Sequence, residues 1–574
     1  MGEANYIWEL QKIDDLVAES LKKELDISIE LARVLYLRGV KDFDSARNYF
    51  RPKWNQLNDG FLMKGMNNSV DRVHQAIINS HNILVYGDYD VDGTCSVSMM
   101  TNFLRSVTKN IFLYQPDRES EGYGISLKSV EWMKENKIDL VIALDCGIKD
   151  IESSKAIKKL NIDLIICDHH NPGVSLPDAF SILNPKQNGC NYPFKDLCGC
   201  GVGFKLIQCL VKKYNLEVDY SFLVQLVAIA TAADIVPLVN ENRILAYLGL
   251  REINKNPIPA LKEIFQITNK KGDVSISDLV FKIAPRINAA GRLSSAIKAA
   301  KFLTSSNVSC TKLVTEIEII NQKRRLLDQE ITSEALSKLK DRNENHATNL
   351  IYSPNWHKGV VGIVASRIIE KYYKPTIVLT GKGDILTGSA RSVKGFDIYS
   401  VLEKLNHYFI SFGGHKYAAG ITLKKENLKP FFKCFETEVK NSIVDECKIP
   451  KIKIDSELSI DSLAFDSKNK SFPKTYRIIK QMEPFGPLNP RPIFLFRNLI
   501  FANKPKIVGE NHIKFNFTDK NISTTIEGIW FNSLSRFEKI KNCKSIDVLA
   551  SLTENNFRDQ LTMQLLVSDL RVVD

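Results

Sequence analysis

The chain has 574 residues, which is too long for a single hydrophobic core, so we expect three or four domains. Hydrophobic residues make up 44% of it and charged residues 25%, a balance that argues against a disordered chain and is typical of globular proteins. The formal net charge of +12 favours a polyanionic partner without proving one.

Cysteine content and hydropathy indicate the compartment. Eleven cysteines are scattered along the chain, and its first residues, MGEANYIWEL, lack the basic, apolar and small-residue regions of a secretory signal. We therefore expect reduced thiols in a cytoplasmic protein. Cys190, Cys198 and Cys200 are close in sequence, but the Cys-Gly-Cys spacing without a second pair disfavours a zinc site. No apolar run reaches membrane-spanning length, so no membrane partner is expected.

Helices and strands alternate after a helical start. Residues 6–51 are rich in Leu, Lys and Glu, and we expect helices that pack on the domain that follows. Further along, apolar periodicity predicts a β-α-β order, with helix 66–79, strand 82–86, helix 94–107, strand 111–114, helix 126–136, and strands 138–144 and 164–167. This order predicts a mostly parallel sheet flanked by helices.

The first of these strands ends in a group of carboxylates. Asp88, Asp90 and Asp92 follow it in the run GDYDVDG. If the strand is buried, the carboxylates lie at its carboxyl end, where open α/β sheets bind ligands. They would repel one another unless a cation neutralised them, and Mg²⁺ and Mn²⁺ favour oxygen ligands. A single Asp-x-Asp would equally suit a solvated acidic turn.

Other apolar runs end in the same way, which strengthens the prediction of a metal site. Asp145 follows strand 138–144, and Asp234 closes the apolar run 226–233. Strand 164–167 is followed by Asp168, His169 and His170. Taken singly, each of these residues fits a helix cap or a core histidine. Taken together, burying so many ionisable groups without a cation would be very costly.

Three later motifs suit phosphate binding. Arg286, Asn288 and Arg292 lie in PRINAAGRL, residues 285–293, where a loop would place two arginines as a phosphate fork; a salt-bridged loop is the alternative. A second α/β lobe is predicted from strand 349–352, helix 360–372 and strand 376–380, and it carries Ser389, Arg391, Gly413, Gly414 and His415. Glycines that let the backbone approach, with Arg and His, suit a terminal phosphate, although Gly-Gly-His alone is often only a turn. No GxxxxGK[ST] motif occurs, so we expect no ATP-driven step.

The remaining segments connect or follow these lobes. Residues 309–340 form the longest helical pattern, which we interpret as a helix joining two lobes, and residues 343–348 read as a linker. Short alternating strands begin near residue 451, including 493–501 and a run with Ile513, Phe515 and Phe517. They predict a small β-barrel, whose aromatics serve as barrel core or as a nucleic-acid surface, and we expect mostly core.

The motifs GDYDVDG, LDCG and DHH, in this order and each after a strand, resemble those of the DHH phosphoesterase superfamily, and GGHKYAAG, residues 413–420, resembles the glycine-rich motif of its DHHA1 domain. With PRINAAGRL and QMEPFGPLNPRPIF, residues 481–494, the set is similar to the RecJ family of bacterial exonucleases. The resemblance implies the α/β class: a DHH parallel-sheet domain and a DHHA1 α/β domain joined by a long helix, plus a C-terminal OB-like β-barrel. The expected divisions are an N-terminal helical segment 1–65, the DHH domain 66–240, a helical connector 241–345, the DHHA1 domain 346–448 and the OB-like domain 449–574.

The resemblance also implies the activity. It implies a single-stranded-DNA-specific exonuclease that degrades 5′ to 3′ by phosphodiester hydrolysis with two Mn²⁺ or Mg²⁺ ions, acting in DNA repair and recombination in the bacterial cytoplasm. The 5′ polarity comes from the resemblance alone. The implied metal ligands are Asp88, Asp90, Asp92, Asp145, His169 and Asp234, with Asp145 bridging. The implied catalytic residues are Asp145, His170, which would contact the scissile phosphate or protonate the leaving oxygen, and Asp168, which would orient its neighbours. The implied substrate-binding residues are Arg286, Asn288, Arg292, Ser389, Arg391, Gly413, Gly414 and His415.

Several alternatives stay open. Tyr86 stands where several DHH enzymes have histidine, so one metal would have an altered ligand set or depend on Asp88. The rival functions are a DHH oligonucleotide or cyclic dinucleotide phosphodiesterase, against which the long C-terminal β region argues, and a non-catalytic scaffold that binds single strands in replication, against which the intact acids argue. Single-stranded DNA is the expected partner, with a helicase and a single-strand-binding protein as further candidates. The sequence leaves open the ion used, the choice of RNA or DNA and the oligomeric state.

Overall fold

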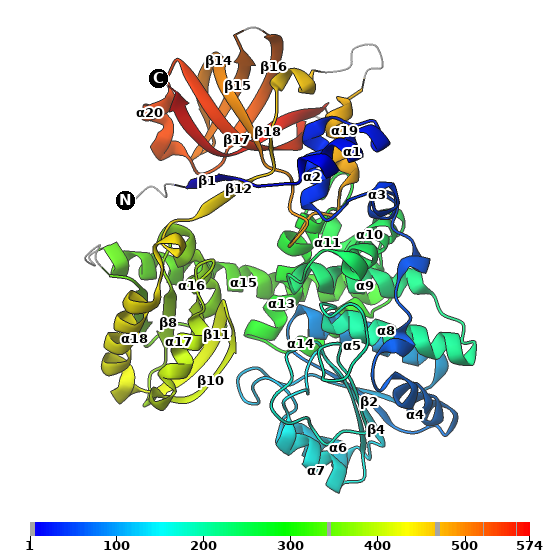
Figure 1. Ribbon diagram of the computed structural model, residues 1–574. Helices are drawn as coiled ribbons and strands as arrows, with labels where there is room; N and C mark the ends of the chain where they lie inside the picture. Colours follow the sequence, from blue (N-terminus) through cyan, green and yellow to red (C-terminus); the bar gives the residue numbers. More distant parts are fainter. Residues whose placement is uncertain (1–5, 341–345, 465–470, 521, 558–559, 574) are drawn as a thin grey trace. The chain divides into compact units, whose positions relative to one another are not determined.

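The alternation predicted after residue 66 builds a five-stranded parallel sheet in the computed structural model (Figure 1). Its strand order is β3-β2-β4-β5-β6, formed by β2 (Ile83–Gly87), β3 (Ile111–Tyr114), β4 (Leu140–Leu144), β5 (Asp163–Cys167) and β6 (Ser181–Leu183). All residues of β2 and β4 are buried, which explains why these runs contain no charged residue. Because the strands are parallel, their carboxyl ends share one edge of the sheet.

The structure describes residues 6–340, 346–464, 471–520, 522–557 and 560–573. By their internal contacts the residues form two units. The first unit contains Gly60–Asp234 and Glu252–Pro450, and the second contains Trp8–Asp59, Ile235–Arg251 and Lys451–Asp574.

Helices cover the parallel sheet in the first unit. They are α4 (Met66–Ile78), α5 (Val91–Val107), α6 (Leu127–Glu135), α7 (Ile151–Lys159), α8 (Gly199–Tyr214) and α9 (Tyr220–Ala233). Helix α5 starts at Val91 rather than at the predicted Thr94, because the side chain of Asp90 caps it by accepting from the Gly93 amide at 3.1 Å. Asp92 therefore lies in the first turn of a helix, not in the preceding loop.

A run of helices follows and ends in the long helix that was predicted to join two lobes. The run comprises α10 (Asn240–Lys255), α11 (Pro259–Ile267), α12 (Ile276–Asp278), the π-helical turn η3 (Leu279–Ile283), α13 (Ala284–Leu293), α14 (Ala296–Leu303) and α15 (Asn307–Lys340). The prediction of a loop for PRINAAGRL was wrong, since these residues are in α13. Pro285 is tolerated in its first turn, and Gly291 provides close packing, because a Cβ there would lie 2.1 Å from the carbonyl oxygen of Tyr89.

The second lobe of this unit is a mixed sheet of order β10-β11-β9-β8-β7, in which only β7 and β8 are parallel neighbours. Its elements are β7 (Asn349–Ser353), α16 (Val361–Lys371), β8 (Thr376–Thr380), β9 (Ile385–Arg391), α17 (Ile398–Lys404), β10 (Phe409–His415), β11 (Ala418–Lys424) and α18 (Leu428–Ser442). GGHKYAAG forms the end of the β10–β11 hairpin, with His415 opposite Ala418. In the predicted linker, residues 343–345 lie outside the described residues, and 346–348 have neither helix nor strand.

The second unit contains the predicted β-barrel. The barrel strands pair in the order β14 (Phe494–Val508), β15 (His512–Asp519), β16 (Ile522–Trp530), β18 (Gln560–Val573) and β17 (Ser545–Phe557). Strand β17 also pairs with β14, which closes the barrel. The short β13 (Ser456–Glu457) adds to β14. Ile513, Phe515 and Phe517 alternate along β15 and are buried, so the expectation that most of this apolar stripe is core is confirmed.

The N-terminal segment belongs to the barrel unit. Helices α1 (Asp15–Leu25), α2 (Ile29–Leu37) and α3 (Phe43–Phe50) share one hydrophobic core with the barrel and with α19 (Lys474–Gln481). The first residues form a strand, β1 (Ile7–Leu10), which pairs with β12 (Lys451–Ile454). The predictions that this segment starts as a helix and packs on the DHH domain were therefore wrong, because its apolar faces are covered by the barrel.

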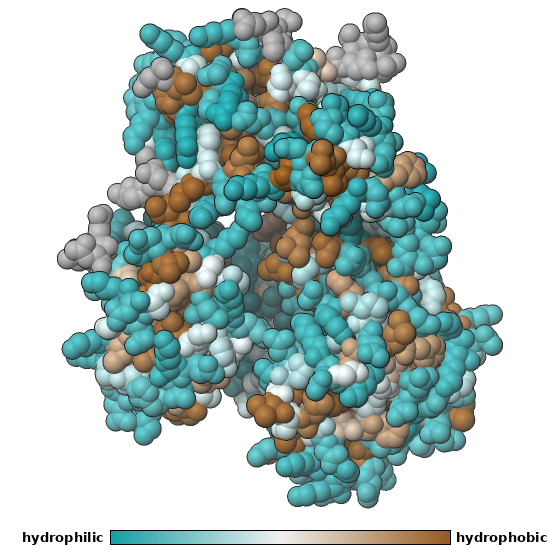
Figure 2. Space-filling model, viewed as in Figure 1, coloured by the Kyte–Doolittle hydropathy of each residue, from teal (hydrophilic) through white to brown (hydrophobic). Residues whose placement is uncertain are grey.

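The remaining elements are short 3-10 helices and one short α-helix: η1 (Trp54–Gln56), η2 (Gly60–Leu62), η4 (Asn406–Tyr408), η5 (Lys425–Asn427), η6 (Asp445–Cys447), η7 (Ile460–Leu463), η8 (Leu534–Arg536) and α20 (Phe537–Ile540). The face seen in Figure 2 is mainly hydrophilic, with apolar side chains in small groups. Among the described residues, no helix has the length and apolar character needed to cross a bilayer.

Candidate metal centre and adjoining pocket

Carboxylates and imidazoles converge where β2, β4, β5 and α9 end. Three groups of side chains have potential ligand atoms within 4.8 Å of one another, namely Asp88, Asp90 and Asp145; Asp92, His169 and Asp234; and Asp145, His169 and His170. Nε2 of His169 lies 3.2 Å from Oδ1 of Asp145, 3.6 Å from Oδ2 of Asp234 and 4.0 Å from Oδ2 of Asp92. Asp145 and His169 each belong to two groups, so the clusters form one centre.

The first turn of helix α8 holds this centre together. The amides of Gly199 and Cys200 donate to the Asp92 carboxylate at 2.6 and 2.8 Å, as expected for an anion at a helix N-terminus. A Cβ at Gly199 would lie 2.5 Å from Cβ of Asp145, so only glycine allows this approach. The glycine-rich run CGCGVGF is thus the start of a helix that holds a carboxylate.

The buried polar atoms of the centre fit a metal ion. Several polar atoms of the centre are buried and have no hydrogen-bond partner within the described part of the chain. They are Oδ1 of Asp88, Oδ1 of Asp145, Nε2 of His169 and Oδ2 of Asp234. Native proteins seldom leave such atoms unsatisfied, because each one costs free energy. Oxygen and imidazole donors that face one another are the ligands preferred by Mn²⁺ and Mg²⁺.

Burial and mutual repulsion disfavour the charged carboxylates. Burial and the neighbouring Asp90 raise the pKa of Asp92 to about 7. Burial, together with Asp92 and Asp90, holds the pKa of Asp145 and that of Asp234 well above the ordinary range. Burial lowers the pKa of His169 to about 3, so its imidazole stays neutral and able to ligate. A cation would offset the repulsion between the carboxylates.

His170 is oriented by a buried carboxylate. Its Nδ1 lies 2.7 Å from Oδ1 of Asp168, whose other oxygen accepts from the amide of Ile148 at 3.0 Å. Burial alone would lower the pKa of His170, but the hydrogen bond and charge of Asp168 raise it. Because Nδ1 is engaged, Nε2 is the nitrogen available to a substrate.

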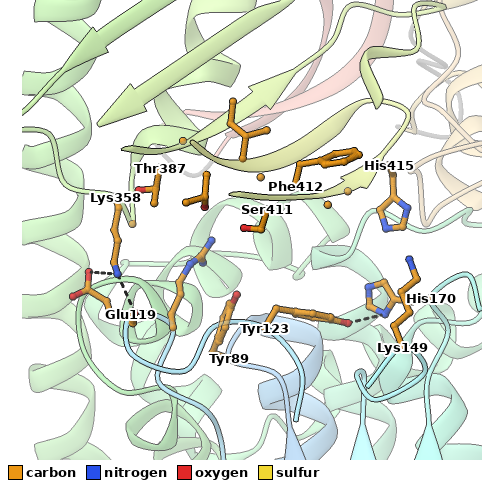
Figure 3. Close-up of a pocket in the computed structure, with 18 of the residues that line it drawn as sticks. Tyr89, Glu119, Tyr123, Lys149, His170, Lys358, Thr387, Ser411, Phe412 and His415 are labelled. Carbon is orange, nitrogen blue, oxygen red and sulfur yellow. Dashed lines mark hydrogen bonds and ion pairs between the residues drawn. The ribbon is translucent and has the colours of Figure 1, made fainter. Parts of the chain in front are cut away.

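A pocket of about 850 Å³ adjoins the centre and receives side chains from both lobes (Figure 3). The rings of His170 and His415 face each other across it, nearly parallel and 6.0 Å apart. The residues that line it include Tyr89, Arg118, Tyr123, His170, Arg292, Lys358, Ser411, Phe412, Gly413, Gly414 and His415.

Arginines give one side of the pocket a positive charge. Burial lowers the pKa of Arg292 to about 9, and the nearby charges of Arg118 and Arg391 act in the same direction. Arg292 donates to the carbonyl of Gly359 at 2.8 Å, and Arg391 donates to Oγ of Ser389 at 2.7 Å. Guanidinium groups that repel one another in a buried place are well suited to an anionic ligand such as a phosphate.

Comparison with known proteins identifies the family. The model of the DHH family, N-terminal domain, matches residues 82–231, that of the DHHA1 domain matches 327–441, and that of the RecJ OB domain matches 454–569. The single-stranded-DNA-specific exonuclease RecJ of Bacillus subtilis (strain 168) is 34% identical over 570 residues, which cover 98% of this chain and 71% of that protein. The chain belongs to the RecJ family.

A second relative supports this assignment, and a solved structure supports the fold. RecJ of Salmonella typhimurium (strain LT2) is 31% identical over 580 residues, covering 96% of this chain and 97% of that one. The crystal structure of RecJ in complex with Mn²⁺ from Thermus thermophilus superposes with a TM-score of 0.84 at 23% identity, covering 99% of this chain and 80% of that one. The predicted fold class, with its DHH, DHHA1 and OB domains, is therefore confirmed.

The predicted metal ligands lie close together in this RecJ-family chain, whereas only some of the predicted substrate-binding residues line the pocket. Arg292, Gly413, Gly414 and His415 line the pocket, and Ser389 and Arg391 contact each other on β9. Arg286 does not line it, because its guanidinium is held by Glu318 at 2.7 Å and by the carbonyl of Lys282. Asn288 is also absent from the lining, although its Oδ1 is buried without a partner among the described residues.

One segment of the pocket was not anticipated from the sequence. The segment PDRESEGYG, residues 116–124, brings Arg118 and Tyr123 to the pocket. It begins two residues after β3, at the same edge of the sheet as the other strand ends. The rule that ligands bind at these strand ends would have found it.

Tyr86 is buried and donates to the carbonyl of Gly124 at 2.8 Å, whereas Asp88 is in the cluster. Of the two interpretations of Tyr86, the geometry therefore favours dependence of the metal on Asp88.

Proposed function

We propose that the protein is a metal-dependent exonuclease that degrades single-stranded DNA from its 5′ end and acts in DNA repair and recombination. The observation that carries this proposal is the set of buried, unpartnered carboxylate and imidazole atoms, within the described residues, beside a pocket lined by arginine. Membership of the RecJ family supports the choice of single-stranded DNA, because its relatives are named for that substrate.

We assign Asp88, Asp90, Asp92, Asp145, His169 and Asp234 as ligands of two Mn²⁺ or Mg²⁺ ions. Asp145 and His169 each lie in two of the ligand groups, and the carboxylate of Asp145 is the better bridge, since it offers two oxygens. Divalent ions held there would activate water as the nucleophile and neutralise charge on the phosphoryl oxygens. The T. thermophilus RecJ structures, which are described as complexes with Mn²⁺ and with Mg²⁺, support either ion.

The other residues of the pocket position the substrate and move a proton. His170 would contact the scissile phosphoryl group through Nε2 and protonate the leaving oxygen, while Asp168 fixes its ring through Nδ1. Arg292 and Arg391 would bind the terminal phosphate, with Arg118 close to both. Gly413 and Gly414 would let the β10–β11 hairpin approach the nucleotide, beside His415. Arg286 would instead anchor α13 to α15 through Glu318.

We also propose the division of labour along the chain and its partners. The DHH domain at 66–240 and the DHHA1 domain at 346–448 would carry the catalytic pocket, with 241–345 as a helical connector. The OB-like domain at 449–574 would bind single strands, and the helices of 1–65 would support it. The chain has no P-loop to drive unwinding, so a helicase would supply the strand and a single-strand-binding protein would present it. A cytoplasmic location fits such partners.

The decisive experiment follows nucleotide release from long single-stranded DNA. A strand labelled at its 5′ end should lose the label as mononucleotide only when Mn²⁺ or Mg²⁺ is present, and a strand labelled at its 3′ end should lose it last. Asp145→Ala and His169→Ala should abolish release. Asp178→Ala is the matched control, because this exposed carboxylate pairs with Lys158 away from the centre.

The same assay separates the rival functions. Faster hydrolysis of dinucleotides or cyclic dinucleotides than of long strands would identify a small-substrate phosphodiesterase. Binding of long strands without metal-dependent release would identify a non-catalytic scaffold. Loss of the 3′ label first would overturn the proposed polarity and leave the nuclease assignment intact.

A further inference from the structure

Tyr123 contacts both the metal centre and the candidate acid, yet it belongs to none of the assigned motifs. Its hydroxyl lies 3.1 Å from Nδ1 of His170 and 3.2 Å from the carbonyl oxygen of Asp145. Its ring meets the ring of His170 edge to face, with centroids 5.6 Å apart. Figure 3 shows Tyr123 in the pocket with its hydroxyl directed at His170, while the ring of His415 lies above that of His170 in this view.

The backbone next to Tyr123 is fixed by neighbouring elements. Gly124 adopts φ +91° and lies so close to Asp150 that a Cβ would come within 2.6 Å of its carboxylate. The carbonyl of Gly124 accepts from the buried hydroxyl of Tyr86 at 2.8 Å, and the amide of Ile125 donates to Asp150 at 2.7 Å. The sheet and the start of α7 therefore determine where the Tyr123 ring lies.

The hydrogen bonds around His170 define what Tyr123 can do. Asp168 is the closer partner of Nδ1, at 2.7 Å, so the Nδ1 proton is donated mainly to that carboxylate. The hydroxyl proton of Tyr123 is then free to go to the carbonyl of Asp145, and its oxygen faces Nδ1. A phenol is protonated at neutral pH, so Tyr123 has a proton to donate. One side chain thus links the backbone of a metal ligand to the imidazole that faces the substrate.

We propose that Tyr123 is a positioning residue, which fixes the His170 imidazole relative to Asp145 so that Nε2 meets the phosphoryl group. This inference rests on the proposed nuclease function and assigns Tyr123 no contact with the reacting atoms. The hydroxyl of Tyr123 therefore affects kcat, the rate of hydrolysis in the bound complex, through His170. It does not affect the binding of substrate or metal.

The test uses Tyr123→Phe, which keeps the ring and removes only the hydroxyl. We expect kcat on single-stranded DNA to fall about tenfold, the usual scale for one oriented hydrogen bond, with KM unchanged. Mn²⁺ affinity, measured by calorimetry without DNA, should equal that of the wild type. In a His170→Ala background, Tyr123→Phe should cause no further loss, because the two changes remove one effect.

Tyr114→Phe is the matched control. Tyr114 also stands at this end of the sheet and donates to Glu121 at 2.9 Å, but it does not line the pocket. This variant should keep wild-type kcat. The inference is overturned if Tyr123→Phe retains full kcat, if it lowers kcat equally in the His170→Ala background, if it weakens Mn²⁺ binding, or if Tyr114→Phe is equally impaired. A wild-type protein without nuclease activity would overturn the proposed function itself, and this inference with it.

Discussion

Oδ1 of Asp145 lies 3.2 Å from Nε2 of His169, although the two residues follow different strands, β4 and β5. Neither atom has a hydrogen-bond partner in the described part of the chain, and both are buried. His169 stays neutral because burial lowers its pKa, so this close approach is no ion pair. The proposed metal between the two groups would account for the arrangement, and the predictions about the centre depend on it.

Mn²⁺ should stabilise the folded protein, and Asp145→Asn should remove this effect. At a concentration of about 100 times its dissociation constant, an ion that binds only the folded state contributes roughly 2.7 kcal/mol, so the wild type should melt several degrees higher with Mn²⁺. The metal-free variant should melt higher than the metal-free wild type, since it lacks a buried carboxylate repelled by its neighbours. Calorimetry with and without Mn²⁺ measures both effects.

Asp178→Asn is the control for this experiment. It changes an exposed carboxylate that pairs with Lys158, so the response to Mn²⁺ should stay as in the wild type. An unchanged Mn²⁺ response in Asp145→Asn would remove Asp145 from the ligand set.

Gly199→Ala should inactivate the enzyme without altering any ligand. The new methyl group would lie 2.5 Å from Cβ and 2.7 Å from Oδ1 of Asp145, so the carboxylate or the start of α8 must move. We expect at least a hundredfold loss of kcat, since a displacement of about 1 Å at a reacting centre has this scale. Nuclease assays with saturating Mn²⁺ measure it.

Gly201→Ala is the matched control in the same helical turn. The atom nearest to its new methyl group would be Cδ2 of Leu197, at 3.3 Å, and this flexible side chain can shift. It should keep near-normal activity. Equal activity of both variants would show that the approach of α8 to Asp145 is not required.

Strand ends were predictable from the sequence, whereas contacts between distant segments were not. The apolar runs before Asp88, Asp145 and Asp168 are buried strands, and a parallel sheet brings their ends to one edge, so the ligand cluster followed from local patterns. Arg286 was expected beside Arg292, but a helix turns the two side chains to different neighbours, Glu318 and Gly359. That separation depends on how α13 packs on α15, which no local pattern reports.

Arg292→Gln should weaken substrate binding, whereas Arg286→Gln should not. Arg292 lines the pocket, and a charge-assisted hydrogen bond to phosphate contributes about 1.5–3 kcal/mol, so KM for single-stranded DNA should rise about tenfold to a hundredfold. The dependence of binding on salt should also weaken, because one phosphate contact is lost. Steady-state nuclease assays measure KM, and fluorescence anisotropy at several salt concentrations measures the salt dependence of binding.

Arg286→Gln provides the comparison on the same helix. It breaks the ion pair with Glu318 and should lower the melting temperature, with KM near that of the wild type. A rise in KM equal to that of Arg292→Gln would place Arg286 in the binding surface after all.

Phe531→Ala should weaken the binding of long single strands. Phe531 follows β16 on the barrel, its side chain is 52% exposed, and its ring meets His512 edge to face at 5.0 Å. Lys506 and Lys514 stand directly opposite each other on β14 and β15, and Glu527 pairs with Lys514 at 2.9 Å, so one of these two positive charges is already neutralised. Loss of one base stacked on an aromatic ring costs about 1–3 kcal/mol, so the dissociation constant should rise about fivefold to a hundredfold.

Leu561→Ala removes an apolar side chain of similar exposure, 50%, from β18 and should leave binding unchanged. If both variants bind long strands as the wild type does, the barrel's exposed ring is not a stacking platform, and the OB-like domain must bind DNA elsewhere or not at all.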